Sequence, residues 1–160
     1  MEWTKENSTA VGKIPSGLFI VTAGSTDKQL DGYLASWVQQ ISFEPLMLSV
    51  AIKPGRPCYD IIKSDGGFTI NVVGKKNSSI MKPFWSGYDP DESPFNTLDN
   101  SSTKTGGVII KGALAGIECK KTQIITEGDH EIIFANVIQC HTLETDDEPM
   151  VHIRKSGIDY

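Results

Sequence analysis

The chain has 160 residues, of which 39% are hydrophobic and 22% charged, ordinary values for a globular protein with one buried core. Its net charge of −5 at pH 7 argues against nucleic acid or an acidic membrane as the main partner, because both favour clustered Lys and Arg. We expect a single domain over residues 1–160.

The sequence also indicates the cellular compartment of the protein. No apolar run approaches the roughly 20 residues that cross a membrane, and the N-terminal segment MEWTKENSTA lacks the apolar core of a signal peptide. The three cysteines, Cys58, Cys119 and Cys140, are an odd number and have no CxxC spacing. A disulfide framework is therefore not expected, and a reducing compartment fits better. These features predict a cytoplasmic protein that contacts no membrane.

The first half of the chain alternates apolar runs with turn residues, which predicts β-strands. Residues 1–16 are polar and interrupted by Gly and Pro, so we expect irregular structure there. Residues 18–23 and 30–36 predict the two strands of a hairpin. Residues 46–52 predict a strand whose larger aliphatic side chains, beginning with Leu46, share one face.

Two short helices are expected next, with a strand between them. Pro57 suits a first helical turn, and residues 58–64 then have one apolar side. Residues 68–73 predict a strand, and residues 80–85 a short helix. Residues 86–107 are rich in Gly, Pro, Asp, Asn, Ser and Thr, which predicts a long loop of the kind that often covers a functional site.

The C-terminal third is strand-like throughout. Residues 108–110, 114–126, 131–143 and 150–154 all predict extended structure, and a Gly-Asp pair indicates a tight hairpin between the two long strands. The total is about six or seven strands, several apolar on both faces, which favours a closed antiparallel barrel.

A basic turn, Lys-Pro-Gly-Arg-Pro at residues 53–57, follows the strand over residues 46–52. Arg56 offers a bidentate fork to a phosphate, and the backbone N–H groups of Cys58 and Tyr59 would point at the anion if a helix begins there. The alternative is a solvated basic turn without a ligand, and the local sequence leaves both open.

A second polar stretch consists of Ser36, Trp37, Val38, Gln39 and Gln40. An isoalloxazine ring needs hydrogen bonds along its pyrimidine edge and an apolar or aromatic flank, and this stretch carries hydroxyl, amide and indole groups. The alternative is a connecting loop whose indole fills the core. The phosphate turn and this stretch together point to a planar, phosphorylated ligand.

The sequence lacks the motifs of several other classes of protein, including zinc proteins, nucleotide-binding folds and hydrolases. His130, His141 and His152 have no spacing that places two on one helix face, and no cysteine pairs with them, so no zinc site is expected. Asp129-His130 closes a predicted hairpin, where the histidine can simply be exposed. The sequence has no GxGxxG, P-loop or GxSxG motif, so dinucleotide-fold, P-loop and hydrolase interpretations have no basis.

Longer segments carry a family resemblance. Residues 31–52 read DGYLASWVQQISFEPLMLSVAI, and residues 55–74 read GRPCYDIIKSDGGFTINVVG. Residues 111–138 read KGALAGIECKKTQIITEGDHEIIFANVI, and residues 149–154 read PMVHIR. In this order and spacing, from about residue 17 to residue 154, the chain resembles the flavin reductase-like, FMN-binding split-barrel family.

The resemblance implies a mainly β fold, a six-stranded antiparallel split barrel of Greek-key type with short helices. It also implies a homodimer with noncovalently bound FMN, reduced by NADH or NADPH. The residues implied to lie along the ring and ribityl chain are Ser36, Trp37, Val38, Gln39 and Gln40, and those near the phosphate are Lys53, Gly55, Arg56 and Cys58. His152 and Arg154 are hypotheses for groups near the nicotinamide or flavin edge. Many members carry a Ser or Thr pair where this chain has Pro57 and Cys58, so a hydroxyl ligand to the phosphate is lost.

The first functional hypothesis is an oxidoreductase that passes electrons from NAD(P)H through bound flavin to a flavin or another acceptor. The alternative is an electron-transfer flavoprotein without a nicotinamide site, reduced by a partner protein. A third is a related barrel that has lost its flavin. Residues 86–107, with Tyr88 and Phe95, have the length to cover a nicotinamide or to dock a partner.

Overall fold

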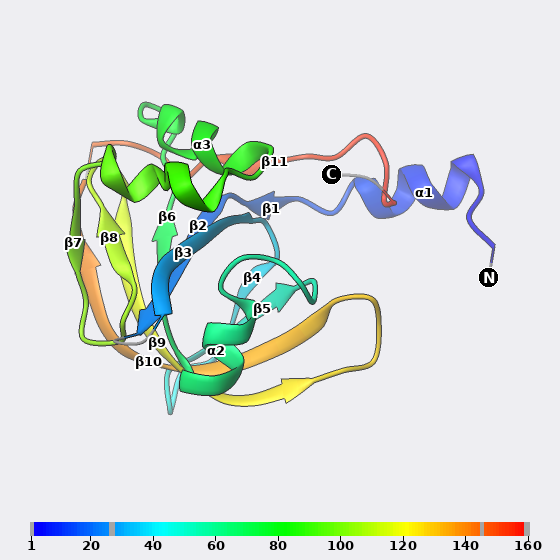
Figure 1. The fold of residues 1–160 in the computed structure, drawn as a ribbon. Coiled ribbons are helices and arrows are strands. Elements are labelled where there is room, and N and C mark those ends of the chain that lie inside the picture. Colours follow the sequence, from blue (N-terminus) through cyan, green and yellow to red (C-terminus); the bar gives the residue numbers. More distant parts are fainter. Residues whose placement is uncertain (1, 26–27, 145, 159–160) are drawn as a thin grey trace.

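The core of the protein is one antiparallel sheet, described by a computed structural model over residues 2–25, 28–144 and 146–158. Figure 1 shows that the sheet curls strongly, with one helix inside the curl. The strands in spatial order are β3 (Lys28–Ala35), β2 (Phe19–Ser25), β6 (Gly67–Val72), β9 (Ala115–Ile125), β10 (Glu131–Thr142), β5 (Met47–Ile52) and β4 (Val38–Ser42).

The prediction of a mainly β, antiparallel fold with short helices is confirmed. Neither the six strands of the expected split barrel nor the closure of the barrel is confirmed. The sheet has seven strands, and within the described residues its edge strands β3 and β4 do not pair with each other. Ser36 and Trp37 connect these two edges, so this short link spans the side on which the sheet is open.

Inside the curl, apolar side chains pack around helix α2 (Tyr59–Asp65). Ile61 and Ile62 of α2 are buried against the same cluster as Phe68 and Ile70 of β6. Strand β5 alternates as predicted, with Leu48, Val50 and Ile52 directed into this cluster, whereas Leu46 precedes the strand and is exposed. Period-two burial therefore fixes the face of β5 that points inward.

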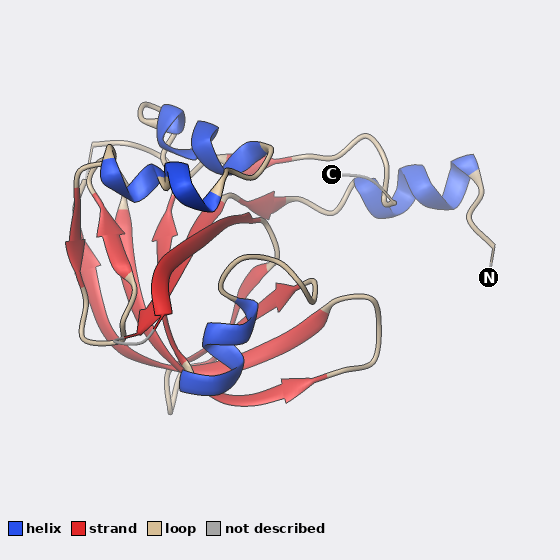
Figure 2. Ribbon diagram, viewed as in Figure 1, coloured by secondary structure: helices blue, strands red, loops and turns tan. Residues whose placement is uncertain are grey.

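A second layer covers the opposite side of β2, β3 and β6, as Figure 2 shows. It contains η1 (Ser78–Met81), α3 (Lys82–Trp85), η2 (Pro90–Glu92), η3 (Pro94–Asn96) and the hairpin of β7 (Asn100–Ser102) with β8 (Val108–Ile110). Residues 86–107, predicted to be a long loop, contain only η2, η3 and β7 as regular elements and are otherwise irregular. Pro90 and Pro94 start the short turns, and Phe95 and Leu98 pack on a buried cluster.

Side chains of β2 and β6 bind the backbone of β8, taking the role that a neighbouring strand would have. The Thr22 hydroxyl donates to the Val108 carbonyl at 3.0 Å. The Asn71 amide donates to the same carbonyl at 3.0 Å and accepts from the Ile110 N–H at 2.8 Å. Because buried backbone groups need partners, these two polar side chains fasten the second layer to the sheet.

The N-terminal segment, predicted to be irregular, forms helix α1 (Lys5–Gly12). A capping box starts it, since the Asn7 N–H donates to Thr4 Oγ1 at 3.2 Å and the Thr4 N–H donates to Asn7 Oδ1 at 2.7 Å. With residues 153–158, α1 forms an arm that projects from the body in Figure 1. Strand β1 (Ser16–Gly17) pairs with β11 (Val151–His152) where the arm joins the sheet. Within the described residues, no helix is long and apolar enough to span a bilayer.

Candidate flavin site

A cavity of about 180 Å³ lies at the open side of the sheet, where β3 and β4 are linked. It collects walls from β3, the end of β5, the basic turn, α3, the tip between β9 and β10, and β11. An adjoining open groove of about 650 Å³ shares Ser36, Trp37 and Ala51 with the cavity. The two hollows therefore share the Ser36–Trp37 link as part of their linings.

The structure brings five of the predicted site residues into the cavity lining: Ser36, Trp37, Lys53, Arg56 and His152. Val38 and Gln39 line the adjoining groove. No strand was predicted over residues 37–40, but β4 begins at Val38 and pairs with β5, which leaves Gln39 and Gln40 exposed on an edge strand. Gln40 donates its side-chain N–H to the Ser42 carbonyl at 3.3 Å.

The basic turn is closed by its own backbone. The Arg56 N–H donates to the Lys53 carbonyl at 3.2 Å, and the Tyr59 N–H donates to the Arg56 carbonyl at 3.1 Å. The prediction that the Tyr59 N–H would face an anion is therefore wrong. Gly55 supplies the positive φ of 82° that the turn requires, and it is exposed. Anion binding at this turn rests on the exposed Lys53 and Arg56 side chains.

Cys58 does not contribute to the surface of the turn. Its φ of 69° places it before the helix, so α2 begins at Tyr59 rather than at residue 58. Its thiol is buried and donates to the Val21 carbonyl at 3.8 Å, and burial raises the pKa of this thiol well above its usual value. The Cys58 side chain thus belongs to the core, so its thiol does not face the surface of the basic turn.

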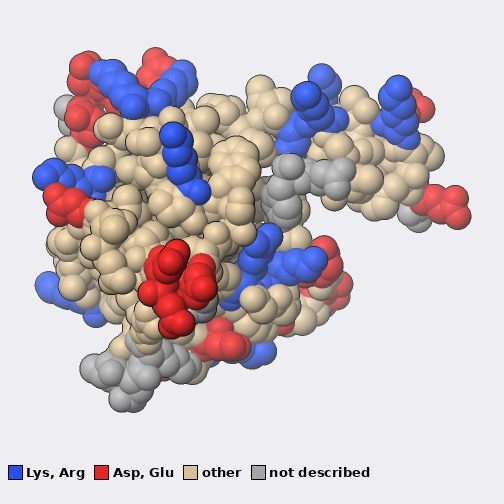
Figure 3. Space-filling model, turned by 45° about the horizontal axis from the view of Figure 1, so that its top comes forward, with Lys and Arg blue, Asp and Glu red and all other residues tan. Residues whose placement is uncertain are grey.

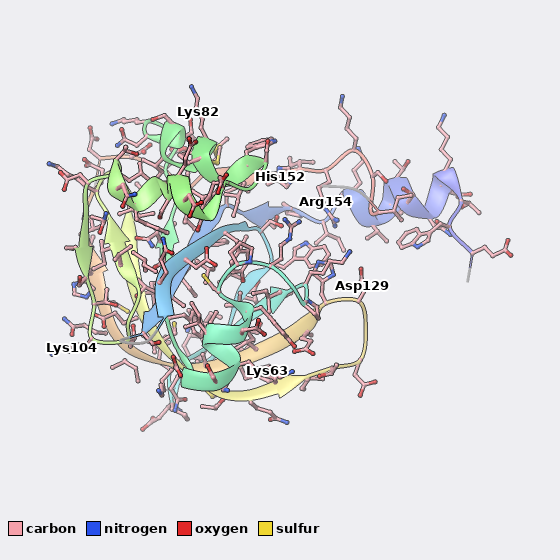
Figure 4. All side chains as sticks on the ribbon, in the orientation of Figure 1. Lys63, Lys82, Lys104, Asp129, His152 and Arg154 are labelled. Carbon is pink, nitrogen blue, oxygen red and sulfur yellow. The ribbon has the colours of Figure 1, made fainter. Side chains whose placement is uncertain are left out.

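Trp37 is contacted by two basic side chains that are distant in sequence. The Arg154 guanidinium lies 5.2 Å from the indole centroid, and the His130 ring centroid lies 4.9 Å from it. Figure 4 shows that His152 and Arg154 approach from the C-terminal segment, while Asp129 sits at the tip of the long hairpin. This cation–π contact places Arg154 at the site, although Arg154 does not line the cavity itself.

His130 is a site residue that the sequence reasoning missed. The connection between β9 and β10 spans residues 126–130 rather than a tight Gly-Asp turn, and its last residue reaches the cavity. His130 Nδ1 lies 3.0 Å from the Asp129 carboxylate, and only 14% of the His130 side chain is exposed. The hydrogen bond from His130 lowers the pKa of Asp129, with a smaller contribution from Lys53. The Gly-Asp-His element was the available signal, because it places an acid beside the histidine.

The wall opposite the basic turn comes from α3 and residues 86–88. The Tyr88 hydroxyl donates to the Asp31 carboxylate and accepts from the Gly32 N–H at 2.9 Å. Burial, followed by the hydrogen bond to Asp31, raises the pKa of Tyr88. Phe84 packs edge-on against Tyr88 with ring centroids 5.8 Å apart. This wall lies more than fifty residues from Asp31 in sequence, so no local sequence pattern predicts the contact between them.

The charges around the site have a simple layout. Figure 3 shows Lys and Arg side chains gathered between the arm and the body, with acidic side chains beside them. The basic turn supplies Lys53 and Arg56 on this side, with Asp129 within electrostatic range of Lys53. Within the residues described, no group of three or more His, Cys, Asp or Glu side chains is placed to hold a metal ion. The site is therefore suited to an organic anion with an aromatic part.

The curled sheet, the basic turn and the aromatic link together define a flavin reductase-like architecture. The family model described as "Flavin reductase like domain" matches residues 11–157. This chain belongs to that family.

Several known proteins are similar to the chain. A putative diflavin flavoprotein A 5 from Nostoc sp. is 32% identical over 152 residues, which is 94% of this chain and 26% of that protein. Diflavin flavoprotein A 1 from Synechocystis sp. is 30% identical over 149 residues, 92% of this chain and 26% of that protein. The chain thus spans about a quarter of the length of these curated relatives.

Solved structures share the fold. An NADH:FAD oxidoreductase of Streptomyces globisporus aligns with a TM-score of 0.82 at 22% identity, covering 93% of this chain and 87% of its own. A putative flavin reductase from Haemophilus somnus aligns with a TM-score of 0.81 at 22% identity, covering 97% of this chain and 96% of its own. Both are evidence for the fold alone.

Proposed function

We propose that this chain is an FMN-binding oxidoreductase that passes electrons from NADH or NADPH through the bound flavin to a flavin or another acceptor. The observation that carries the proposal is that one cavity joins the Ser36–Trp37 link to Lys53 and Arg56. A hydroxyl and an indole suit a planar heterocycle, while two cations suit a phosphate. The family to which the chain belongs supports the same reading.

The residues present fit FMN in charge and in chemical type. The cavity of about 180 Å³ is smaller than the roughly 300–1,000 Å³ of typical ligand pockets, and a groove of about 650 Å³ shares Trp37 with it. On this proposal the flavin extends past Trp37 into that groove. FMN, when bound, supplies the electron-accepting ring. The protein's part is to hold the phosphate at Lys53 and Arg56, to flank the ring with Trp37, and to limit the access of water with Tyr88.

The experiment that tests the proposal is anaerobic reduction. The FMN-loaded protein is mixed with NADH, and separately with NADPH, while the visible flavin absorbance is followed. Hydride transfer needs reacting atoms roughly 3–3.5 Å apart, so a protein that builds this geometry will bleach within seconds, faster than free FMN. Free FMN under identical conditions is the control.

A rate no better than that of free FMN with both nucleotides would reject the reductase. The leading function would then be an electron-transfer flavoprotein reduced by a partner protein. One observation favours keeping this second candidate: in the diflavin flavoprotein relatives the matching region is 26% of a longer protein. Reduction of the bound FMN by a partner protein, but not by nucleotide, would be its positive result.

We further propose a homodimer in which a second copy completes the flavin site. The arm projects from the body rather than covering its own sheet (Figure 1). It leaves Ile14 and Ile153 63% and 65% exposed, while Ile132 in the adjoining groove is 40% exposed. Such apolar surface is typical of an interface.

Light scattering coupled to size exclusion at micromolar concentration is therefore expected to give twice the 17.5 kDa chain mass. Ile132→Glu is expected to shift the protein toward monomer and to weaken FMN binding together, since a buried charge disfavours the interface. The matched control is Ile109→Glu, a half-buried position in the β7–β8 hairpin. A monomer that binds FMN as tightly as the unaltered protein would contradict the proposal.

A further inference from the structure

Trp85 is an aromatic side chain left exposed at the mouth of the cavity. It lines the cavity from the last residue of α3, yet its exposed fraction is 66%. Its neighbour Phe84 is only 5% exposed and belongs to the buried cluster of the second layer. Within the described residues the indole ring has no recorded aromatic or cation–π partner. A large ring held at a ligand pocket but not packed in the core is available to a ligand.

The backbone that carries Trp85 is firmly held. Phe84 packs against Tyr88 at 5.8 Å and against Phe95 at 5.6 Å between ring centroids. Tyr88 in turn is hydrogen-bonded to Asp31 and to the Gly32 N–H on β3. Binding of a ligand to Trp85 therefore requires little further ordering of the backbone, because the segment is already fixed on both sides of the indole.

The space available indicates which part of a ligand reaches Trp85. On the proposed function, the nicotinamide ring must lie against the flavin inside the cavity, because hydride transfer requires direct stacking. A cavity of about 180 Å³ does not hold a complete dinucleotide beside a flavin, and the groove past Trp37, which Trp85 does not line, is taken up by the flavin on the proposed function. The second aromatic ring of the dinucleotide, its adenine, is therefore left outside, at the mouth where Trp85 lies.

We propose that the Trp85 indole is the surface on which the adenine ring of NADH or NADPH stacks. This inference rests on the proposed function, since it requires a nicotinamide dinucleotide as the electron donor. Adenine presents a flat π face, and stacking of a base on an aromatic side chain needs no hydrogen-bonding partner. Trp85 then sets affinity for the dinucleotide and takes no part in the transfer of hydride.

The test compares NADH with reduced nicotinamide mononucleotide, which keeps the reacting ring but lacks the adenine half. Trp85→Ala is expected to raise the KM for NADH about 5- to 150-fold, the range for removing one base-stacking ring. The kcat for NADH is expected to stay within about twofold, because the lost contact is the same in the ground and transition states. The KM for the mononucleotide and the affinity for FMN are expected to stay unchanged.

Matched variants separate stacking from other effects. Trp85→Phe keeps a ring and is expected to lose less than Trp85→Ala. Lys82→Ala alters the start of the same helix at a side chain that points outward (Figure 4), and it is expected to change neither KM. Trp3→Ala removes another exposed indole, on the arm, and is expected to behave like the unaltered protein.

Each outcome decides the inference. An unchanged KM for NADH in Trp85→Ala, or equal losses with NADH and the mononucleotide, would overturn the adenine assignment while leaving the reductase intact. If the unaltered protein oxidises neither donor faster than free FMN does, the proposed function fails first, and the adenine site fails with it. A selective loss with NADH alone supports both.

Discussion

Arg56→Ala is expected to weaken FMN binding about 10- to 150-fold, which corresponds to about 1.5–3 kcal/mol for a charge-assisted hydrogen bond. Arg56 lines the cavity with an exposed guanidinium, and its turn is closed by backbone bonds that alanine keeps. Riboflavin has the same ring but no phosphate. Its affinity is expected to remain unchanged, so the preference for FMN over riboflavin collapses in the variant. Quenching of flavin fluorescence during titration of the apoprotein measures both affinities.

Two comparisons make this result specific. Lys111→Ala removes the same unit of charge at an exposed position paired with Asp99 at 2.8 Å, outside the cavity lining. It is expected to leave FMN binding unchanged, which excludes a general effect of net charge. Stability of the Arg56→Ala apoprotein is also expected to be unchanged, since exposed cations contribute little. An equal loss of FMN and riboflavin affinity would assign Arg56 a structural role instead.

Asn71→Leu is expected to destabilise the protein by about 2–4 kcal/mol, because it leaves the buried Ile110 N–H without its partner. Leucine keeps the branched shape of asparagine but is larger, so the change removes the hydrogen bonds and also strains the packing around a fully buried position. For a chain of this size the melting temperature is expected to fall by about 5–15 °C. Thermal unfolding of the apoprotein followed by circular dichroism measures the fall.

The matched control is Asn96→Leu, the same substitution at an exposed residue of η3. Its effect is expected to stay within about 0.5 kcal/mol, as for ordinary surface positions. Equal melting temperatures for the two variants would show that Asn71 does not anchor β8. Because β8 packs in the same cluster as Phe84, the Asn71 variant is also expected to loosen the wall that carries Trp85.

Local patterns in the sequence predict the elements whose environment is simple. The alternation of Leu48, Val50 and Ile52 is visible in β5 because one face of that strand is buried. Strand β4 was missed because an edge strand with a solvated face carries polar residues such as Gln39, which read as a loop. Helix α1 was missed because its Thr4–Asn7 capping box has Asn in place of the usual Glu or Gln.

The site residues also divide into those that a local sequence pattern predicts and those that it does not. Lys53 and Arg56 share one turn, so a phosphate-binding hypothesis is possible from adjacent residues alone. Tyr88 and His130 reach the cavity only through the packing of α3 and the length of the β9–β10 connection. The Gly-Asp-His element places an acid beside His130, but no local pattern indicates how far the hairpin tip or Tyr88 reaches toward the basic turn. The direction of the Cys58 thiol likewise follows from a left-handed backbone conformation that its neighbours do not announce.

The pairing of β1 with β11 joins residues near the two ends of the chain, Ser16 with His152 and Gly17 with Val151. Closing a loop of that length carries a large entropic cost, which the earlier pairing of the sheet reduces. We therefore expect the segment that brings Arg154 to Trp37 to dock late, after the strands between have found their register. On the proposed function, cofactor affinity is then expected to report on folding of the whole chain, whereas secondary structure reports on the central sheet.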